Sequence, residues 1–109
     1  MSPHDVSLVN SFRQRLPADV GERVRAIKVF GSRARGQDAA DSDLDVLVLV
    51  DRWDAALEKQ IEDAAYGAMW DDDFRVILSV KVFSEGEFLD LARRGWSFFR
   101  AVQRDGISV

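Results

Sequence analysis

The segment over residues 44–50, which reads Leu-Asp-Val-Leu-Val-Leu-Val, most strongly limits what this chain can fold into. Valine and leucine fill nearly every position, a pattern typical of a β-strand that is buried on both faces. A strand of that kind must lie inside a sheet that other elements cover. The run is also too short to cross a bilayer, because a membrane-spanning helix needs about 20 apolar residues.

The flanking sequence supplies elements that could cover such a sheet. Segments with apolar residues at helical spacing predict helices, and apolar runs bounded by polar turns predict strands. Asp51 or a nearby residue is expected to cap a helix over 53–70, and Ser84 is expected to cap a helix over 85–94. We expect helices over 5–16, 53–70, 85–94 and 96–104, and strands over 24–30, 44–50 and 74–83. They predict a single α/β (α+β) domain over 1–109, with helices packed on a small mixed sheet.

Length and charge restrict the function further. The chain has 109 residues, which suits one core, and a formal net charge of −4. An acidic chain lacks the positive field with which proteins bind nucleic-acid phosphates, so direct DNA binding is not expected. There is no cysteine, and the N-terminus lacks the pattern of a signal peptide. These properties predict a cytoplasmic protein without membrane association.

The turn after the first strand has the composition of a phosphate-binding loop. Gly31 lets the backbone turn sharply and lets a ligand approach its amide. Ser32 offers a hydroxyl and an N–H group to an anion, and a short helix opening after it would add further N–H groups. Arg33 and Arg35 could contribute charge-assisted hydrogen bonds to phosphate oxygens. Taken alone, such a segment is more often an ordinary turn with surface arginines.

Two carboxylates follow at the start of the central strand. Asp43 and Asp45 are two residues apart, so both would project from one face of a strand. Two neighbouring negative charges are unfavourable unless a cation or hydrogen-bond donors lie between them. Mg²⁺ prefers such oxygen ligands and commonly bridges carboxylates to substrate phosphates. An isolated Asp-x-Asp is more often a solvated strand start, but next to a phosphate-binding turn it predicts nucleotidyl transfer.

The sequence Gly-Ser-Arg-Ala-Arg-Gly at 31–36, with Ser-Asp-Leu-Asp at 42–45, resembles the signature of the minimal nucleotidyltransferase (MNT) domains of the DNA polymerase β-like superfamily. The resemblance covers essentially the whole chain. It implies that Gly31 and Ser32 hold the triphosphate of ATP, and that Asp43 and Asp45 are the catalytic carboxylates that bind Mg²⁺. It further implies that the chain is the antitoxin of a HEPN/MNT pair and transfers AMP from Mg-ATP to a HEPN-family toxin protein.

One position departs from that family pattern. The superfamily usually carries a third carboxylate on a later strand, and the alignment puts Ser79 there. Serine is a weak, neutral ligand, and Lys81 would share its face. This departure leaves open a catalytically inactive domain that neutralises a partner toxin by binding alone. Nucleotide transfer to a small molecule is a third hypothesis, but the chain lacks the additional domain that usually forms the acceptor pocket.

Several other residues carry weaker expectations. Asp71–Asp73 are expected to be a solvated strand start, and His4 a surface residue. The aromatic side chains near the C-terminus could pack in a core helix or form a surface for self-association, which would make the protein a homo-oligomer; these residues are Trp96, Phe98 and Phe99. The tryptophans are expected in the core or at a subunit contact rather than stacked on a base, and they are Trp53, Trp70 and Trp96.

Overall fold

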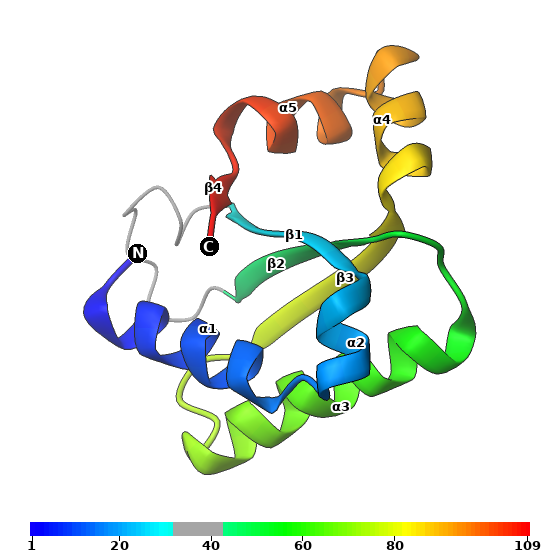
Figure 1. Ribbon diagram of the computed structural model, residues 1–109. Helices are drawn as coiled ribbons and strands as arrows, with labels where there is room; N and C mark the ends of the chain where they lie inside the picture. Colours follow the sequence, from blue (N-terminus) through cyan, green and yellow to red (C-terminus); the bar gives the residue numbers. More distant parts are fainter. Residues whose placement is uncertain (32–42) are drawn as a thin grey trace.

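The computed structural model describes residues 1–31 and 43–109 (Figure 1). The helices are α1 (Pro3–Arg15), α2 (Ala18–Arg23), α3 (Ala55–Asp71), α4 (Glu85–Arg93) and α5 (Ser97–Asp105). The strands are β1 (Val24–Phe30), β2 (Leu44–Val50), β3 (Leu78–Ser84) and β4 (Ile107–Ser108). The sheet order is β3-β2-β1-β4, with β2 parallel to β3 and the β1–β2 and β1–β4 pairs antiparallel. The predicted mixed sheet with helices packed on it is therefore confirmed.

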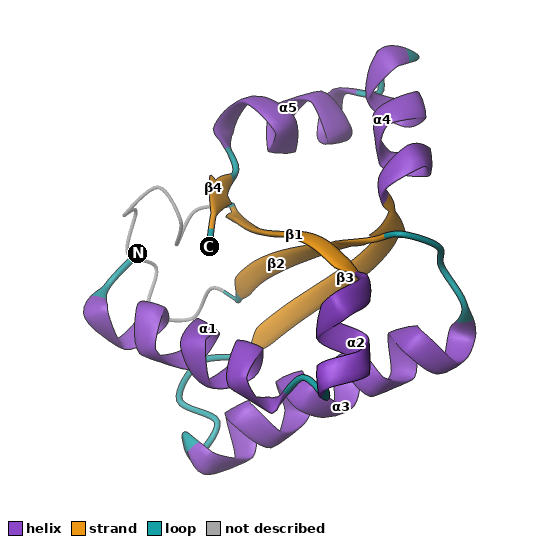
Figure 2. Cartoon of the chain, in the orientation of Figure 1, coloured by secondary structure: helices purple, strands orange, loops and turns teal. Residues whose placement is uncertain are grey.

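Strand β2 lies between β1 and β3 and is buried on both faces, as its composition predicts. Alternate residues of β2 enter two separate hydrophobic cores. Val46 and Val48 pack with side chains from α1 and α3, whereas Leu47 and Leu49 pack with side chains from α4 and α5. The two layers of helices on opposite sides of the sheet are visible in Figure 2. No helix within the described ranges is long and apolar enough to cross a membrane.

Capping interactions fix where α1 and α3 begin. The Ser2 hydroxyl accepts a hydrogen bond from the Asp5 N–H, and the Asp5 carboxylate accepts one from the Ser2 N–H, which completes a capping box. Helix α3 begins after Asp54, whose carboxylate accepts the Leu57 N–H at 2.8 Å. Asp51 lies three residues before this N-cap and does not cap the helix. Its carboxylate accepts hydrogen bonds from the Arg23 side chain and from the Arg52 N–H.

The segment between α3 and β3 differs from the sequence-based expectation. The predicted strand over 74–83 was wrong at its start, because β3 begins only at Leu78. Asp73 and Phe74 adopt positive φ angles of 56° and 54°, which turn the chain back toward the sheet. Asp71–Asp73 therefore terminate a helix rather than open a strand. His4 bonds to Asp72 through Nε2 at 3.0 Å and joins α1 to this turn.

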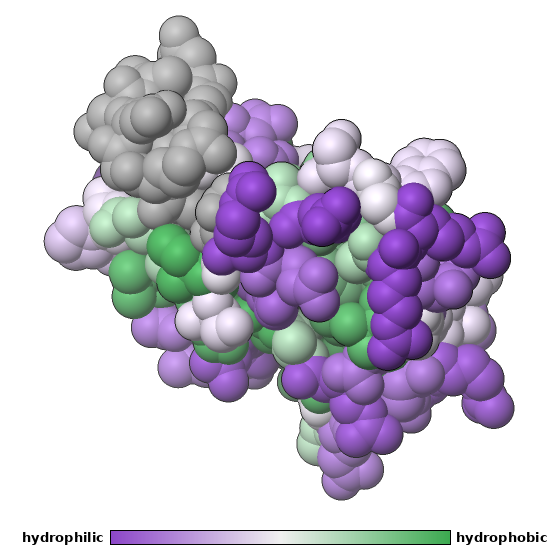
Figure 3. Space-filling model, turned by 90° about the horizontal axis from the view of Figure 1, so that it is seen from above, coloured by the Kyte–Doolittle hydropathy of each residue, from purple (hydrophilic) through white to green (hydrophobic). Residues whose placement is uncertain are grey.

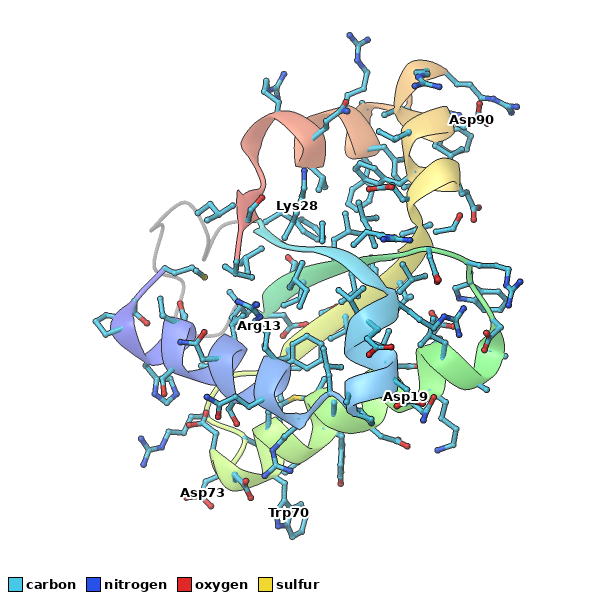
Figure 4. The ribbon with its side chains drawn as sticks, viewed as in Figure 1. Arg13, Asp19, Lys28, Trp70, Asp73 and Asp90 are labelled. Carbon is cyan, nitrogen blue, oxygen red and sulfur yellow. The ribbon has the colours of Figure 1, made fainter. Side chains whose placement is uncertain are left out.

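The tryptophans were expected in the core or at a subunit contact. The first alternative was wrong, and the second stays a prediction. Trp53, Trp70 and Trp96 are between 45% and 64% exposed. Trp70 extends from the end of α3 away from the sheet (Figure 4). Of the aromatic residues on α5, Phe99 is buried and Phe98 remains partly exposed. In the view from above, hydrophobic and hydrophilic residues are mixed on the surface (Figure 3). Self-association through this face stays a prediction.

Candidate functional site

The face of the sheet below α4 and α5 carries polar side chains on β2 and β3 where its apolar core ends. Asp45 on β2 lies in register with Phe30 on β1 and with Ser79 on β3. Residues paired in this way share one face of a sheet, so these three side chains are neighbours. Further along β2 on this face, Leu47 and Leu49 belong to the apolar core. The sheet thus places the Asp45 carboxylate at the border between packed core and open surface.

Gly31 closely approaches Asp45 from the end of β1. Its φ angle is +85°, a conformation that side chains disfavour. A Cβ atom added at this position would lie only 2.6 Å from the Asp45 Oδ2 atom. Only glycine satisfies both conditions without a shift of the carboxylate. The arrangement places Gly31, the first residue of the predicted phosphate-binding turn, directly beside one predicted metal-binding carboxylate.

The electrostatic environment of Asp45 is unusual for an aspartate. Burial raises the pKa of Asp45, because the half-buried carboxylate loses part of its hydration. The Lys81 ammonium group acts in the opposite direction, and the neighbouring Asp43 carboxylate raises the pKa further. The net rise means that the negative charge of Asp45 is poorly stabilised in the free protein. A cation placed between the two carboxylates would stabilise the negative charge of Asp45.

Asp43 lies directly before β2 and is exposed to solvent. Its electrostatic effect on Asp45 indicates that the two carboxylates are close. Their oxygens form a donor set that hard divalent cations such as Mg²⁺ prefer, provided that substrate oxygens or water supply the remaining ligands. The described part of the chain has no group of three or more acidic or histidine side chains that could hold a metal alone. The residues present therefore fit a metal bound jointly with a substrate.

The remaining predicted residues divide into two groups. Ser32, Arg33 and Arg35 lie outside the described residues. Ser79 lies beside Asp45 in the parallel β2–β3 ladder, where the resemblance places a third carboxylate. No acidic side chain occupies that position, so the described site contains two carboxylates.

Lys28 is a candidate that the sequence analysis overlooked. It pairs with Leu47, and Leu47 also pairs with Lys81. A lysine therefore lies on each side of β2, at the position two residues after Asp45. Lys28 points to the same face as Phe30 and is partly buried on β1 below α5 (Figure 4). The available signal was its position two residues before Phe30 in an alternating strand. Two lysines beside a carboxylate pair are suited to hold the oxygens of a polyphosphate.

Comparison with known proteins agrees with this reading of the fold. Residues 7–96 match the nucleotidyltransferase domain family. No curated protein sequence matches the chain. Among solved structures, a Sulfolobus solfataricus protein proposed to be a nucleotidyltransferase is similar, with a TM-score of 0.50 at 16% sequence identity. That match covers 99% of this chain and 86% of the other.

The domain match spans most of the chain, so this protein belongs to the nucleotidyltransferase domain family. Members of this class typically use a nucleotide substrate and a divalent metal ion as cofactor. The structural similarity supports the fold alone, because the sequence identity is low.

Proposed function

We propose that this chain transfers AMP from ATP, in the presence of Mg²⁺, to a partner protein. The acceptor proposed from the sequence resemblance is a HEPN-family toxin, with this chain as its antitoxin. The observation that carries the proposal is the close approach of Gly31 to the Asp45 carboxylate. A turn of this kind can present backbone N–H groups to phosphates, and the carboxylate can hold the cation that accompanies them.

Each residue would have a defined part in the reaction. Gly31 and Ser32 would bind the triphosphate, and Arg33 or Arg35 would add positive charge to it. Asp43 and Asp45 would hold Mg²⁺, which when bound would neutralise charge on the α-phosphate and on the departing pyrophosphate. The bond that breaks joins the α-phosphorus to the α–β bridging oxygen, which leaves with pyrophosphate. The bond that forms joins that phosphorus to an acceptor hydroxyl oxygen, whose proton passes to solvent.

Lys28 and Lys81 would add to this electrostatic support. Both lie on the face that carries Asp45, so they could contact phosphate oxygens without displacing the carboxylates. Because the charge that develops in the transition state of phosphoryl transfer is spread over several oxygens, fixed cations near these oxygens lower the energy of the transition state. Loss of either lysine should weaken ATP binding less than loss of both carboxylates.

Calorimetric titration of ATP, with and without Mg²⁺, tests the proposed site. We expect Mg²⁺-dependent binding by the native chain and its loss when Asp43→Asn and Asp45→Asn are combined. Asp90→Asn is a matched control, because Asp90 is an exposed aspartate on α4 that pairs only with Arg94 among the described residues. If the double variant binds Mg-ATP like the native chain, these carboxylates do not form the nucleotide site.

A second candidate function is neutralisation of a partner by contact alone. The observation that favours it is Ser79 beside Asp45, since the position offers no third carboxylate to activate an acceptor hydroxyl. Mass spectrometry of the partner after incubation with Mg-ATP separates the two functions. AMP attached to the partner supports transfer. Neutralisation that persists in the Asp43→Asn, Asp45→Asn double variant, without modification of the partner, supports contact alone.

A further inference from the structure

The outer edge of β3 leaves backbone hydrogen-bonding groups without a strand partner. Strand β3 is the last strand on its side of the described sheet. The Ile77 carbonyl points toward β2, where it accepts the Leu44 N–H at 2.8 Å. The next N–H, that of Leu78, points the other way and donates to the Met69 sulfur at 3.2 Å. Because backbone direction alternates along a strand, Val80 and Val82 also direct their N–H and C=O groups away from β2.

A groove runs along this edge. One cavity of about 300 Å³ lies between α3 and β3, with Tyr66 and Val80 in its wall. A second cavity of about 520 Å³ continues along the strand and contains Val80, Val82 and Trp53. Since Val80 borders both cavities, they adjoin along the strand, and together they are called the groove below. The exposed rings of Tyr66 and Trp53 belong to its walls, and aromatic side chains of this kind are common anchors in protein interfaces.

The walls of the groove are acidic. Glu62 borders the first cavity, while Glu58 and Glu87 border the second. Within the described residues, none of these three carboxylates forms an ion pair. Lys81 is a basic residue of the wall, but its side chain belongs to the opposite face of β3 from Val80 and Val82. An occupant that satisfied this groove would therefore carry positive charge on the side facing α3.

We propose that the β3 edge docks an extended segment of a partner protein that alternates basic and apolar residues. The segment adds a strand to the sheet through the N–H and C=O groups of Val80 and Val82. Its Lys or Arg side chains face Glu58 and Glu62. A second copy of this chain is a poorer occupant, because β3 of the copy would bring its own Glu58 and Glu62 toward the same acidic wall.

Binding of a short synthetic peptide that alternates lysine and valine to the full ¹⁵N-labelled chain provides the test. We expect changes of amide chemical shift and slower hydrogen exchange at Val80 and Val82. A peptide that alternates glutamate and valine should bind at least roughly tenfold more weakly, since it repels the acidic wall. A peptide with N-methyl groups on its pairing amides should not bind, because it cannot form the added ladder. This last comparison needs no protein variant.

Protein variants test the same contacts from the other side. Val80→Pro removes one outward N–H, and proline is tolerated where an edge-strand N–H faces solvent, so binding should fall roughly tenfold. Glu58→Gln with Glu62→Gln should weaken binding and reduce its salt dependence, whereas Asp19→Asn with Glu22→Gln on α2 should not. Asp45→Asn should bind the peptide normally, which separates this proposal from the nucleotide site.

Four outcomes would overturn the proposal. The first is no binding of the lysine–valine peptide, and the second is equal binding of the N-methylated peptide. The third is perturbation of amides elsewhere while those of Val80 and Val82 stay unchanged. The fourth is a dimer of this chain that already protects the Val80 and Val82 amides from exchange, since the edge would then belong to a second copy.

Discussion

Replacing Gly31 by alanine should disturb both the stability of the fold and the position of the Asp45 carboxylate. At the observed φ of +85°, a residue with a side chain is strained by about 1–2 kcal/mol. The added Cβ would also lie 2.6 Å from Asp45 Oδ2, so the carboxylate must rotate away at a further cost of roughly 0.5–1.5 kcal/mol. The expected loss in the free energy of unfolding is therefore about 2–3 kcal/mol, or about 10 °C in Tm.

Urea denaturation followed by tryptophan fluorescence measures this loss, and a double-mutant cycle separates its two causes. In an Asp45→Ala background the carboxylate is absent, so Gly31→Ala should cost only the conformational strain of about 1–2 kcal/mol. The difference of about 1 kcal/mol between the two backgrounds reports the contact between Gly31 and Asp45. Gly21→Ala is the control, because nothing lies within 4 Å of a Cβ added in helix α2.

Two results would refute this reasoning. A cost of less than about 0.5 kcal/mol in the native background would mean that Gly31 does not hold a left-handed conformation. Equal costs in the two backgrounds would mean that the turn and the carboxylate are not in contact. Mg²⁺-dependent ATP binding should weaken together with stability in Gly31→Ala, and a variant that loses stability but binds normally would remove Gly31 from the proposed site.

Three further perturbations follow from the packing and charge of particular residues. Asp45→Asn should raise Tm at neutral pH. Because the folded-state pKa of Asp45 is raised, the native carboxyl group contributes to stability below its unfolded pKa, and this contribution is lost as pH rises through the folded pKa. The gain in Tm from the substitution should therefore vanish in acid. The effect of Asp54→Ala on Tm should have the opposite pH dependence. Hydrogen bonds from the Leu57 N–H and then from Arg23 lower the pKa of Asp54. The contribution of the Asp54 carboxylate to stability is therefore present above its unfolded pKa and lost as pH falls through its folded pKa. Thermal melts across pH check both. Phe12→Ala should cost about 3–5 kcal/mol in urea denaturation, since the Phe12 ring is fully buried between α1 and the sheet.

The sequence predicted the elements that have strong local patterns. Strands β1 and β2 begin and end at the predicted residues, because β1 alternates apolar and basic residues, β2 is an apolar run, and both are bounded by polar or turn-forming residues. Helices α1 and α3 followed from their apolar spacing, and their capping residues lie near the predicted starts. In each case the local preference and the tertiary packing favour the same conformation.

Elements that depend on distant partners escaped the sequence analysis. Helix α2 is short and buries Val20, so it has too little periodicity to be recognised. Strand β4 consists of two residues whose conformation depends on pairing with Lys28 and Val29 of β1. The apolar residues over 74–77 suggested that β3 starts earlier, but the chain needs them to turn from the end of α3.

For the same reason, the sequence could point to the candidate site only in part. The carboxylate pair and the glycine turn are local patterns, so residue type and spacing could point to them. The contact between Gly31 and Asp45 depends on the antiparallel register of β1 and β2, which no local pattern encodes. Lys28 was missed because its role as a neighbour of Leu47 and Lys81 arises only when the three strands are assembled.

The packing of β2 explains why an unfavourable carboxylate can persist in this fold. Val46 and Val48 are fully buried on one face, and Leu47 and Leu49 are buried on the other. These residues hold the strand from both sides, so the backbone of Asp45 cannot move to hydrate its side chain. The sheet therefore keeps the charge poorly solvated, and the proposed Mg²⁺ would compensate it. The same geometry predicts opposite effects of Asp45→Asn, which should stabilise the free protein and abolish Mg²⁺-dependent nucleotide binding.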